Sequence, residues 1–235
     1  MNMYTIMAII LIGAMIYNFR NLRIKFRTFF KKGFRPNRGV FGVYCYCGKQ
    51  GSGKTYSVVR FLIEQQHKNP GIKIYSNLKS LNGIKYTYFS GFDELLKLRS
   101  ESNCIIVYDE IFTALTKSSR MNNDVLDFLS QMRKRKIIFL TTAQEWLEIN
   151  ITLRRYCRYQ IDCSMKTFIV GILMKKMYDA ENMKWSNEIN EYDAPLLTTT
   201  IEKCNVEVAN SYDTFEQINS NKKTASSVAS HAQRN

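Results

Sequence analysis

The segment from Gly48 to Thr55 has the residue types and spacing of a phosphate-binding loop. It reads GKQGSGKT and fits the pattern G-x-x-x-x-G-K-[ST] completely. Glycines let backbone N–H groups turn inward around phosphates, and a helix that begins at the loop adds its positive end. The Lys54 ammonium would reach the β- and γ-phosphates, and the Thr55 hydroxyl would hold Mg²⁺. We therefore expect a nucleoside triphosphate and Mg²⁺ to contact Gly48, Lys49, Gln50, Gly51, Ser52, Gly53, Lys54 and Thr55.

The flanking sequence favours this interpretation over a merely structural glycine-rich turn. The β-branched and aromatic run Val40–Cys47 ends at a glycine and predicts a buried strand. The segment Thr55–Gln66 has apolar residues at helical spacing and ends before Asn69-Pro70. A strand before the loop and a helix after it are the context that a phosphate-binding loop requires.

Two adjacent acids, Asp109 and Glu110, follow the apolar run CIIVY over Cys104–Tyr108. Such a run is typical of a strand in a parallel sheet that is covered on both faces. Asp109 would ligate Mg²⁺ or accept a hydrogen bond from its bound water. Glu110 is the candidate general base that orients and activates the attacking water. In the alternative interpretation, the two acids only begin a solvated helix, where they would suit the helix dipole.

Gln144 lies just beyond a further apolar run, IIFL over 137–140. Because the carboxyl ends of parallel strands share one crevice, Gln144 is a candidate sensor of the γ-phosphate, or else a polar loop residue. The basic run that precedes this strand lies on its other side, away from the chain's own nucleotide. Arg133 or Arg135 would then stabilise the transition state in a neighbouring subunit, with Arg154 and Arg155 as weaker candidates. The alternative is a solvated basic turn or a phosphate-contacting patch.

These residues require a sheet whose strands alternate with helices. We expect five strands, at Val40–Cys47, Ile72–Ser76, Cys104–Tyr108, Ile137–Leu140 and Tyr159–Cys163. Besides the helix after the loop, we expect helices around 94–98 and over Val125–Arg133. Strands that alternate with helices imply right-handed crossovers and a mostly parallel α/β sheet. Phe168–Met174 would extend the sheet or form a hairpin with a later segment, and Trp185 and Tyr212 would pack the domain or face a partner.

The N-terminal residues 1–19 carry no charged side chain, and residues 20–38 carry eight basic side chains and no acid. Nineteen helical residues reach about 28 Å, close to the hydrocarbon thickness of a bilayer. The positive-inside rule then places the N-terminus outside and the rest of the chain in the cytoplasm. The alternatives are a buried or partner-facing helix and a cleaved signal peptide, and the basic segment with its phenylalanines would also suit nucleic acid.

The amino-acid composition excludes several other classes of protein. Apolar residues make up 45% of the 235, which excludes global disorder, and 11 Gly with 3 Pro exclude a collagen-like chain. The net charge of +14 is concentrated at the N-terminus, because eleven basic residues precede the first acid, Glu64. The six cysteines lack zinc-site spacing, so we expect them to be reduced and buried.

The expected domains are an anchor (1–19), a basic juxtamembrane segment (20–38), a P-loop ATPase domain (39–216) and a disordered polar tail (217–235).

The motifs resemble the additional-strand P-loop ATPases of the FtsK–HerA class, in particular zonular-occludens-toxin-like and viral DNA-packaging ATPases. The matching pieces are YCGKQGSGKTYSVVRFL, IKIYSN, CIIVYDEIF, FLSQMRKRKIIFLTTAQ and LRRYCRYQID, over roughly residues 40–163. The resemblance implies a RecA-like core, ATP as the nucleotide, and a ring, a hexamer, that moves DNA without sequence preference. It makes Lys54, Thr55, Asp109 and Glu110 catalytic, Gln144 the sensor, and Arg133 or Arg135 the trans-acting finger.

The position of the predicted anchor departs from that family. Zonular-occludens-toxin-like proteins usually carry their membrane segment after the ATPase domain, whereas here it precedes the domain. The expected function is a membrane-anchored, genome-packaging motor of a virus or mobile element, located at the membrane or in the virion. Two rival functions are a filamentous-phage-type extrusion ATPase with coat-protein partners and a nucleotide-gated membrane scaffold with negligible turnover.

Overall fold

The computed structural model describes residues 3–7, 40–113, 115, 123–166, 171–186 and 191–213. The chain divides into two units, Met1–Gly39 and Val40–Asn235. In the first unit, residues 3–7 are helical. Within the described residues, no helix is both long and apolar enough to span a bilayer. Apart from residues 3–7, the predicted anchor and basic segment lie outside the described residues, as does the predicted tail over 217–235.

The second unit begins with strands that alternate with helices and continues as antiparallel strands. The strands are β1 (Gly42–Cys47), β2 (Lys73–Ser76), β3 (Thr87–Tyr88), β4 (Cys104–Tyr108), β5 (Ile137–Ala143), β6 (Cys157–Lys166), β7 (Ile172–Asp179), β8 (Lys184–Ser186), β9 (Glu191–Asp193) and β10 (Leu196–Lys203). The α-helices are α2 (Lys54–Lys68), α3 (Phe92–Lys97), α4 (Asn123–Gln131), α5 (Ile151–Tyr156) and α6 (Val206–Asn210). Single 3₁₀ turns include η4 (Trp146–Glu148) and η5 (Ala180–Asn182).

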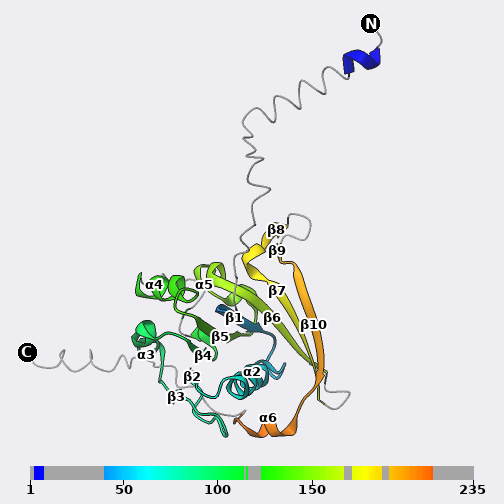
Figure 1. The fold of residues 1–235 in the computed structure, drawn as a ribbon. Coiled ribbons are helices and arrows are strands. Elements are labelled where there is room, and N and C mark those ends of the chain that lie inside the picture. The colour runs from blue at the N-terminus through cyan, green and yellow to red at the C-terminus, as the bar shows by residue number, and fades with distance from the viewer. Residues whose placement is uncertain are drawn as a thin grey trace, which may run out of the picture. The chain divides into compact units, whose positions relative to one another are not determined.

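The main sheet has the strand order β10-β7-β6-β1-β5-β4-β2-β3 (Figure 1). The six strands from β6 to β3 are parallel, and β7 and β10 add an antiparallel extension beside β6. The register pairs Cys47 with Ala143 and Tyr108 with Thr141. The carboxyl ends of β1, β4 and β5 therefore meet at one edge of the sheet. Strands β8 and β9 form a separate two-stranded ribbon.

Two apolar cores cover the two faces of the sheet. On β1 the side chains of Val43, Cys45 and Cys47 enter one core, and those of Tyr44 and Tyr46 enter the other. Helices α3, α4 and α5 supply apolar residues to the first core, and α2 and α6 supply them to the second. Because both faces are covered, the central strands need continuous apolar runs, as the sequence of β1, β4 and β5 shows.

The predicted mostly parallel α/β sheet is confirmed, and all five predicted strands are present. Strand β5 is longer than predicted, because Thr141, Thr142 and Ala143 are fully buried and continue the pairing with β1. Helix α4 ends at Gln131, two residues earlier than predicted, and a turn over 132–136 leads into β5. Strand β7 extends the sheet as predicted, although it starts at Ile172 and pairs first with the preceding strand β6.

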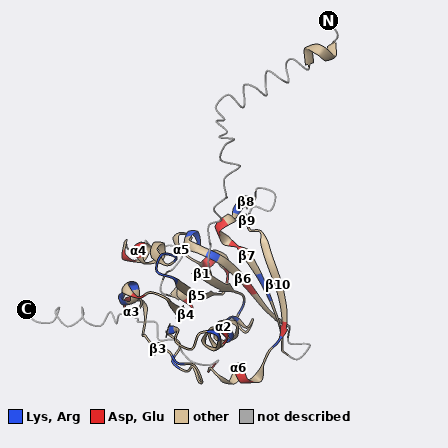
Figure 2. Ribbon diagram, in the orientation of Figure 1, with Lys and Arg blue, Asp and Glu red and all other residues tan. Residues whose placement is uncertain are grey.

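The cysteines are unpaired, and all except the half-buried Cys204 are buried, in agreement with reduced apolar cysteines. Cys45 and Cys47 lie on one face of β1, with 3.7 Å between their sulfur atoms. Basic and acidic residues occur together on α2, α3, β6, β7 and β10 (Figure 2). Residues 1–38, with eight basic side chains and no acid, supply more than half of the net charge of +14.

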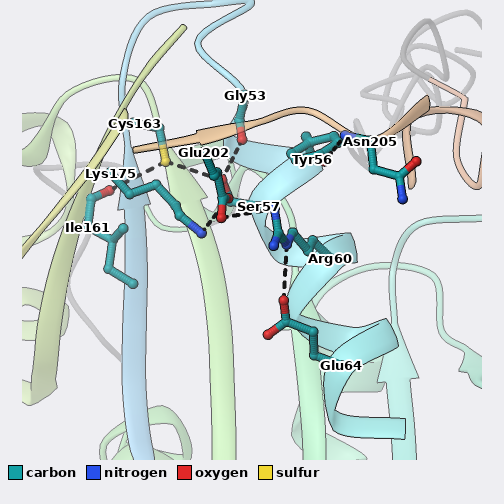
Figure 3. A network of polar contacts seen from close by, with 10 residues as sticks. All are labelled: Gly53, Tyr56, Ser57, Arg60, Glu64, Ile161, Cys163, Lys175, Glu202 and Asn205. Atoms are coloured by element: carbon teal, nitrogen blue, oxygen red, sulfur yellow. Dashed lines mark hydrogen bonds and ion pairs between the residues drawn. The ribbon is translucent and has the colours of Figure 1, made fainter. Parts of the chain in front are cut away.

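A polar network fastens α2 to the antiparallel extension (Figure 3). The Glu202 carboxylate on β10 accepts from Arg60 of α2 at 2.9 Å and from Lys175 of β7 at 2.8 Å. Arg60 also contacts Glu64 one helical turn away, at 3.0 Å. The Glu202 side chain is only 14% exposed, whereas the Glu64 side chain is 48% exposed. Glu202 therefore joins three elements in partial shelter from water, which strengthens its ion pairs.

We predict that Glu202→Gln lowers the free energy of unfolding by about 1–2 kcal/mol, because it leaves the two sheltered cations without their shared counter-charge. Glu64→Gln is the matched control and should cost about 0.5 kcal/mol or less, since it removes only an exposed pair within one helix. Urea unfolding of the two variants, followed by circular dichroism, measures both values. Equal losses in the two variants would contradict the linking role of Glu202.

Candidate nucleotide site

The predicted phosphate-binding loop connects β1 to α2 at the carboxyl edge of the sheet. Its first residue is fixed to the neighbouring strand end, because the Gly48 N–H donates to the Gln144 carbonyl at 3.1 Å. The Lys54 ammonium lies over the loop and donates to the carbonyls of Gly48 and Lys49 at 2.7 and 3.1 Å. The Ser52 hydroxyl oxygen is buried and has no hydrogen-bond partner in the described part of the chain. This arrangement of backbone, ammonium and hydroxyl fits a bound phosphate.

Two glycines of the loop have backbone geometry that other residues adopt poorly. Gly48 has a φ of 146°, and a Cβ atom there would lie 2.5 Å from the Cys163 carbonyl oxygen and 2.5 Å from the Ser52 hydroxyl oxygen. Gly53 has a φ of 87°, and a Cβ atom there would meet Leu173 at 2.8 Å. The loop is therefore packed tightly against β6 and β7, and only glycine fits at its two ends.

The Asp109 carboxylate is the polar centre of the site. It lies directly after β4, and its two oxygens accept hydrogen bonds from the hydroxyls of Thr55 at 3.3 Å and Thr142 at 2.6 Å. The Asp109 backbone is fixed as well, because its N–H donates to the Asn77 side chain and its carbonyl accepts from the same amide group. Residues from α2, β5 and the end of β2 thus converge on one acid.

Burial raises the pKa of Asp109 above the usual aspartate range. The hydrogen bond from Thr142 opposes this shift, the negative charge of Glu110 adds to it, and the Thr55 hydrogen bond and the Lys54 charge oppose it. The buried carboxylate therefore carries an unfavourable charge that a bound cation would compensate.

Glu110 lies in the left-handed region of backbone conformation, with a φ of 56°. This conformation costs a non-glycine residue about 1–2 kcal/mol, and such strain clusters at functional sites. A hydrogen bond holds the residue there, because the Glu110 N–H donates to the Thr142 hydroxyl at 2.8 Å. Thr142 therefore sets the positions of both acids.

A cleft of about 540 Å³ brings these residues together, within the size range of small-molecule sites, about 300–1,000 Å³. Its lining includes Gly51, Ser52, Lys54, Thr55, Asp109 and Glu110. Gln144 lines a second hollow on the other side of the loop, together with Lys49 and Gln50. The structure thus places Gln144 next to the loop, in contact through its backbone, and outside the lining of the cleft.

The predicted basic run lies far from the cleft, as expected. It forms the turn before β5, and the seven residues of that strand extend over about 20 Å to the carboxyl edge. The Arg133 guanidinium contacts the carboxylate of Glu181 in η5 at 3.3 Å, and Arg135 donates to the Gln131 side chain at 2.5 Å. Neither arginine takes part in the chain's own cleft.

Sequence reasoning missed the supporting residues Asn77 and Thr142. Asn77 directly follows the predicted strand Ile72–Ser76, and Thr142 is the second residue after the run Ile137–Leu140. The rule that parallel strand ends share a crevice was therefore the available signal. Only the register shows which polar side chain at each strand end reaches the acid.

The donors around Asp109 suit Mg²⁺. They are oxygen atoms, the Thr55 hydroxyl and the Asp109 carboxylate, which this hard cation prefers. Among the described residues, no group of three or more His, Cys, Asp or Glu side chains is arranged to hold a metal ion. Mg²⁺ is usually bound by one or two carboxylates together with substrate phosphates and water.

Residues 44–167 match the family described as ATPase family associated with various cellular activities (AAA), over more than half of the chain. The chain belongs to this AAA family. It is therefore an ATPase, and the predicted class of P-loop ATPases is confirmed. The matched region starts in β1 and ends just after β6, so it includes the loop, both acids and Gln144.

The AAA domain also shares its fold with solved structures. One is the N-terminal domain of zonular occludens toxin from Neisseria meningitidis, with 16% identity, a TM-score of 0.53, and coverage of 73% of this chain and 98% of the other. Another is the genome packaging NTPase B204 from Sulfolobus turreted icosahedral virus 2, with 10% identity, a TM-score of 0.50, and coverage of 70% and 97%. At these identities the likeness establishes the fold alone. No curated protein matches the sequence.

We predict that Gly48→Ala weakens nucleotide binding by the AAA domain at least tenfold, because the added Cβ displaces either the Cys163 carbonyl or Ser52. Gly51→Ala is the control, since a Cβ there meets nothing within 4 Å and only the backbone strain at a φ of 76° remains. Calorimetric titration with a non-hydrolysable ATP analogue compares the two variants. An equal effect of both substitutions would show that the close packing at Gly48 is unimportant.

The raised pKa of Asp109 predicts a pH dependence of stability without Mg²⁺. Between the ordinary aspartate pKa, about 4, and the raised value, the folded AAA domain binds more protons than the unfolded chain. Its free energy of unfolding should therefore fall as the pH rises through that interval. The difference between wild type and Asp109→Asn, measured by urea unfolding in EDTA over that range, isolates this contribution. A constant difference would contradict it.

Proposed function

We propose that this ATPase is a DNA-translocating motor of a virus or mobile element, and specifically a genome-packaging ATPase. The observation that carries the proposal is the convergence of Lys54, Thr55, Asp109 and Glu110 on one cleft, since an adjacent acid suits repeated hydrolysis. The fold shared with the packaging NTPase B204 supports the cellular role.

Each of these residues has a proposed chemical role. Lys54 and the loop N–H groups bind the β- and γ-phosphates of ATP, and Thr55 and Asp109 hold Mg²⁺. When bound, Mg²⁺ neutralises charge on the phosphate oxygens. Glu110 takes a proton from the attacking water, from a position that Thr142 fixes through the backbone. Gln144 reports the state of the nucleotide across the loop, through the hydrogen bond of its carbonyl with Gly48.

The motor is proposed to be a ring, a hexamer, that surrounds DNA. Arg133 or Arg135 would act on the neighbouring subunit's ATP, because both lie at the sheet edge remote from their own cleft. In that case the contact between Arg133 and Glu181 holds the arginine until the neighbour is engaged. The partners would be DNA without sequence preference and proteins of the virion vertex.

The proposed organisation places the motor at a membrane. Residues 1–19 are the single-pass anchor with an outside N-terminus, and residues 20–38 contact anionic headgroups. Residues 39–216 form the cytoplasmic ATPase domain, and residues 217–235 are the polar tail. The hydropathy and charge of the sequence support this arrangement.

A second candidate is a filamentous-phage-type extrusion ATPase. The fold likeness to the zonular occludens toxin domain favours it, with a TM-score of 0.53. A coat protein would then be the dominant partner instead of DNA. A nucleotide-gated membrane scaffold, the third candidate, would bind ATP with negligible turnover.

The test is steady-state ATP hydrolysis by the full-length chain in detergent, with and without duplex DNA of random sequence. Wild type should turn over, and DNA should stimulate it several-fold. Glu110→Gln should bind ATP normally and lose at least a hundredfold in kcat, because general bases typically contribute about 10²–10⁴ in rate. A matched control is Glu145→Gln, an acid next to Gln144 that lines the second hollow and leaves the cleft intact.

Three outcomes would contradict parts of this proposal. Equal turnover in wild type and Glu110→Gln would remove the base assignment. Turnover that responds to a coat protein and not to DNA would favour extrusion. A near-zero rate under all conditions would favour the scaffold.

A further inference from the structure

The C-terminal strap, residues Asn205–Asp213, forms a wall of the nucleotide cleft that the phosphate-site motifs do not explain. It leaves the end of β10, contains α6, and lies beside α2 (Figure 1). The last two residues of the strap, Tyr212 and Asp213, line the same cleft as Lys54 and Asp109. The strap thus brings residues from nearly the end of the described chain to its first motif.

The strap is fixed at both ends, so its position is defined by the fold. At its start, the Asn205 N–H donates to the hydroxyl of Tyr56, the third residue of α2, at 2.7 Å (Figure 3). At its end, the Ser211 carbonyl accepts from the Asn82 N–H at 2.7 Å, and Tyr212 forms a bridge with Leu81. Between these points Val208 is buried against the α2 face of the sheet.

The chemistry of the strap suits the nucleoside and not the phosphates. The loop end of the cleft supplies backbone N–H groups, the Lys54 ammonium and hydroxyl donors, which complement negative charge. The strap supplies a half-buried phenol ring and an exposed carboxylate. A carboxylate repels phosphate but accepts hydrogen bonds from ribose hydroxyls, and an aromatic ring offers a face to a base.

We propose that the strap is the nucleoside subsite, in which Tyr212 contacts the base and Asp213 accepts a hydrogen bond from the ribose. This inference rests on the proposed function of the loop as the phosphate site. It makes Tyr212 and Asp213 determinants of nucleotide affinity, separate from the residues that act on the phosphates.

Calorimetric titration of the full-length chain in detergent, without DNA, tests the subsite with two ligands. One is a non-hydrolysable ATP analogue, and the other is inorganic tripolyphosphate, which lacks the nucleoside. Tyr212→Ala should weaken binding of the analogue about tenfold, since stacking on an aromatic ring contributes about 1–3 kcal/mol per base. Binding of tripolyphosphate should stay within twofold. Asp213→Asn should give the same pattern with a smaller loss, about three- to tenfold, because asparagine keeps an oxygen acceptor and removes only its charge.

Tyr212→Phe keeps the ring and should bind the analogue within twofold of wild type, and Asp213→Asn, at an exposed position, tests the subsite even if the alanine variant does not fold. Tyr156→Ala on α5 and Asp193→Asn on β9 are matched controls from exposed positions outside the cleft, and both should leave the two affinities unchanged. Equal weakening of both ligands by Tyr212→Ala or Asp213→Asn, or no weakening of either, would overturn the proposal. Retention of tripolyphosphate binding by Lys54→Ala would instead overturn the proposed phosphate site, and the strap proposal with it.

Discussion

The Asp109 carboxylate, held between two threonine hydroxyls, is the interaction on which the site depends. One hydroxyl belongs to Thr55 in the first turn of α2, and the other belongs to Thr142 at the end of β5. The acid therefore fixes the helix that follows the phosphate loop against the strand that lies between β1 and β4. Because the carboxylate is buried, its charge is unfavourable until a cation is near, and the hydrogen bonds only partly offset that penalty. The buried Asp109 carboxylate therefore favours a cation beside the loop where the phosphates of a nucleotide would bind.

The burial of both faces of the sheet explains why only a few polar residues form the site. Parallel strands with apolar side chains on both faces leave polar groups only at their ends, and the register places the ends of β1, β4 and β5 together. Asn77, at the end of β2, holds the Asp109 backbone from the other side. The strained backbone of Glu110 follows from this packing, because Thr142 binds both the Asp109 side chain and the Glu110 N–H. One threonine therefore couples the buried acid to its half-buried neighbour.

The local patterns of the sequence predict the parallel part of the fold well, because continuous apolar runs and a glycine-rich loop have few alternative structures. Continuous runs precede Gly48 and Asp109, the first of them ends at the glycine-rich loop, and the structure confirms both strands. The antiparallel extension is harder to predict, because the exposed residues of β10 include Leu196, Leu197 and Ile201 and do not alternate with buried ones. The position of Gln144 in a second hollow could not be predicted either. The loop lies between Gln144 and the cleft, and the order of strands and loops along the sequence does not specify this arrangement.

The antiparallel extension helps to position the phosphate-binding loop and α2, which the sequence motifs alone do not indicate. Leu173 and Met165 lie against Gly53, and Glu202 binds Arg60, so β6, β7 and β10 determine where the loop and α2 lie. The strap continues from β10, and its first residue binds the phenol of Tyr56, the residue that follows Thr55. The position of α2 is therefore linked to β10 and to the strap through these contacts. These contacts connect the phosphate site of the ATPase to the outermost strand of its sheet, β10.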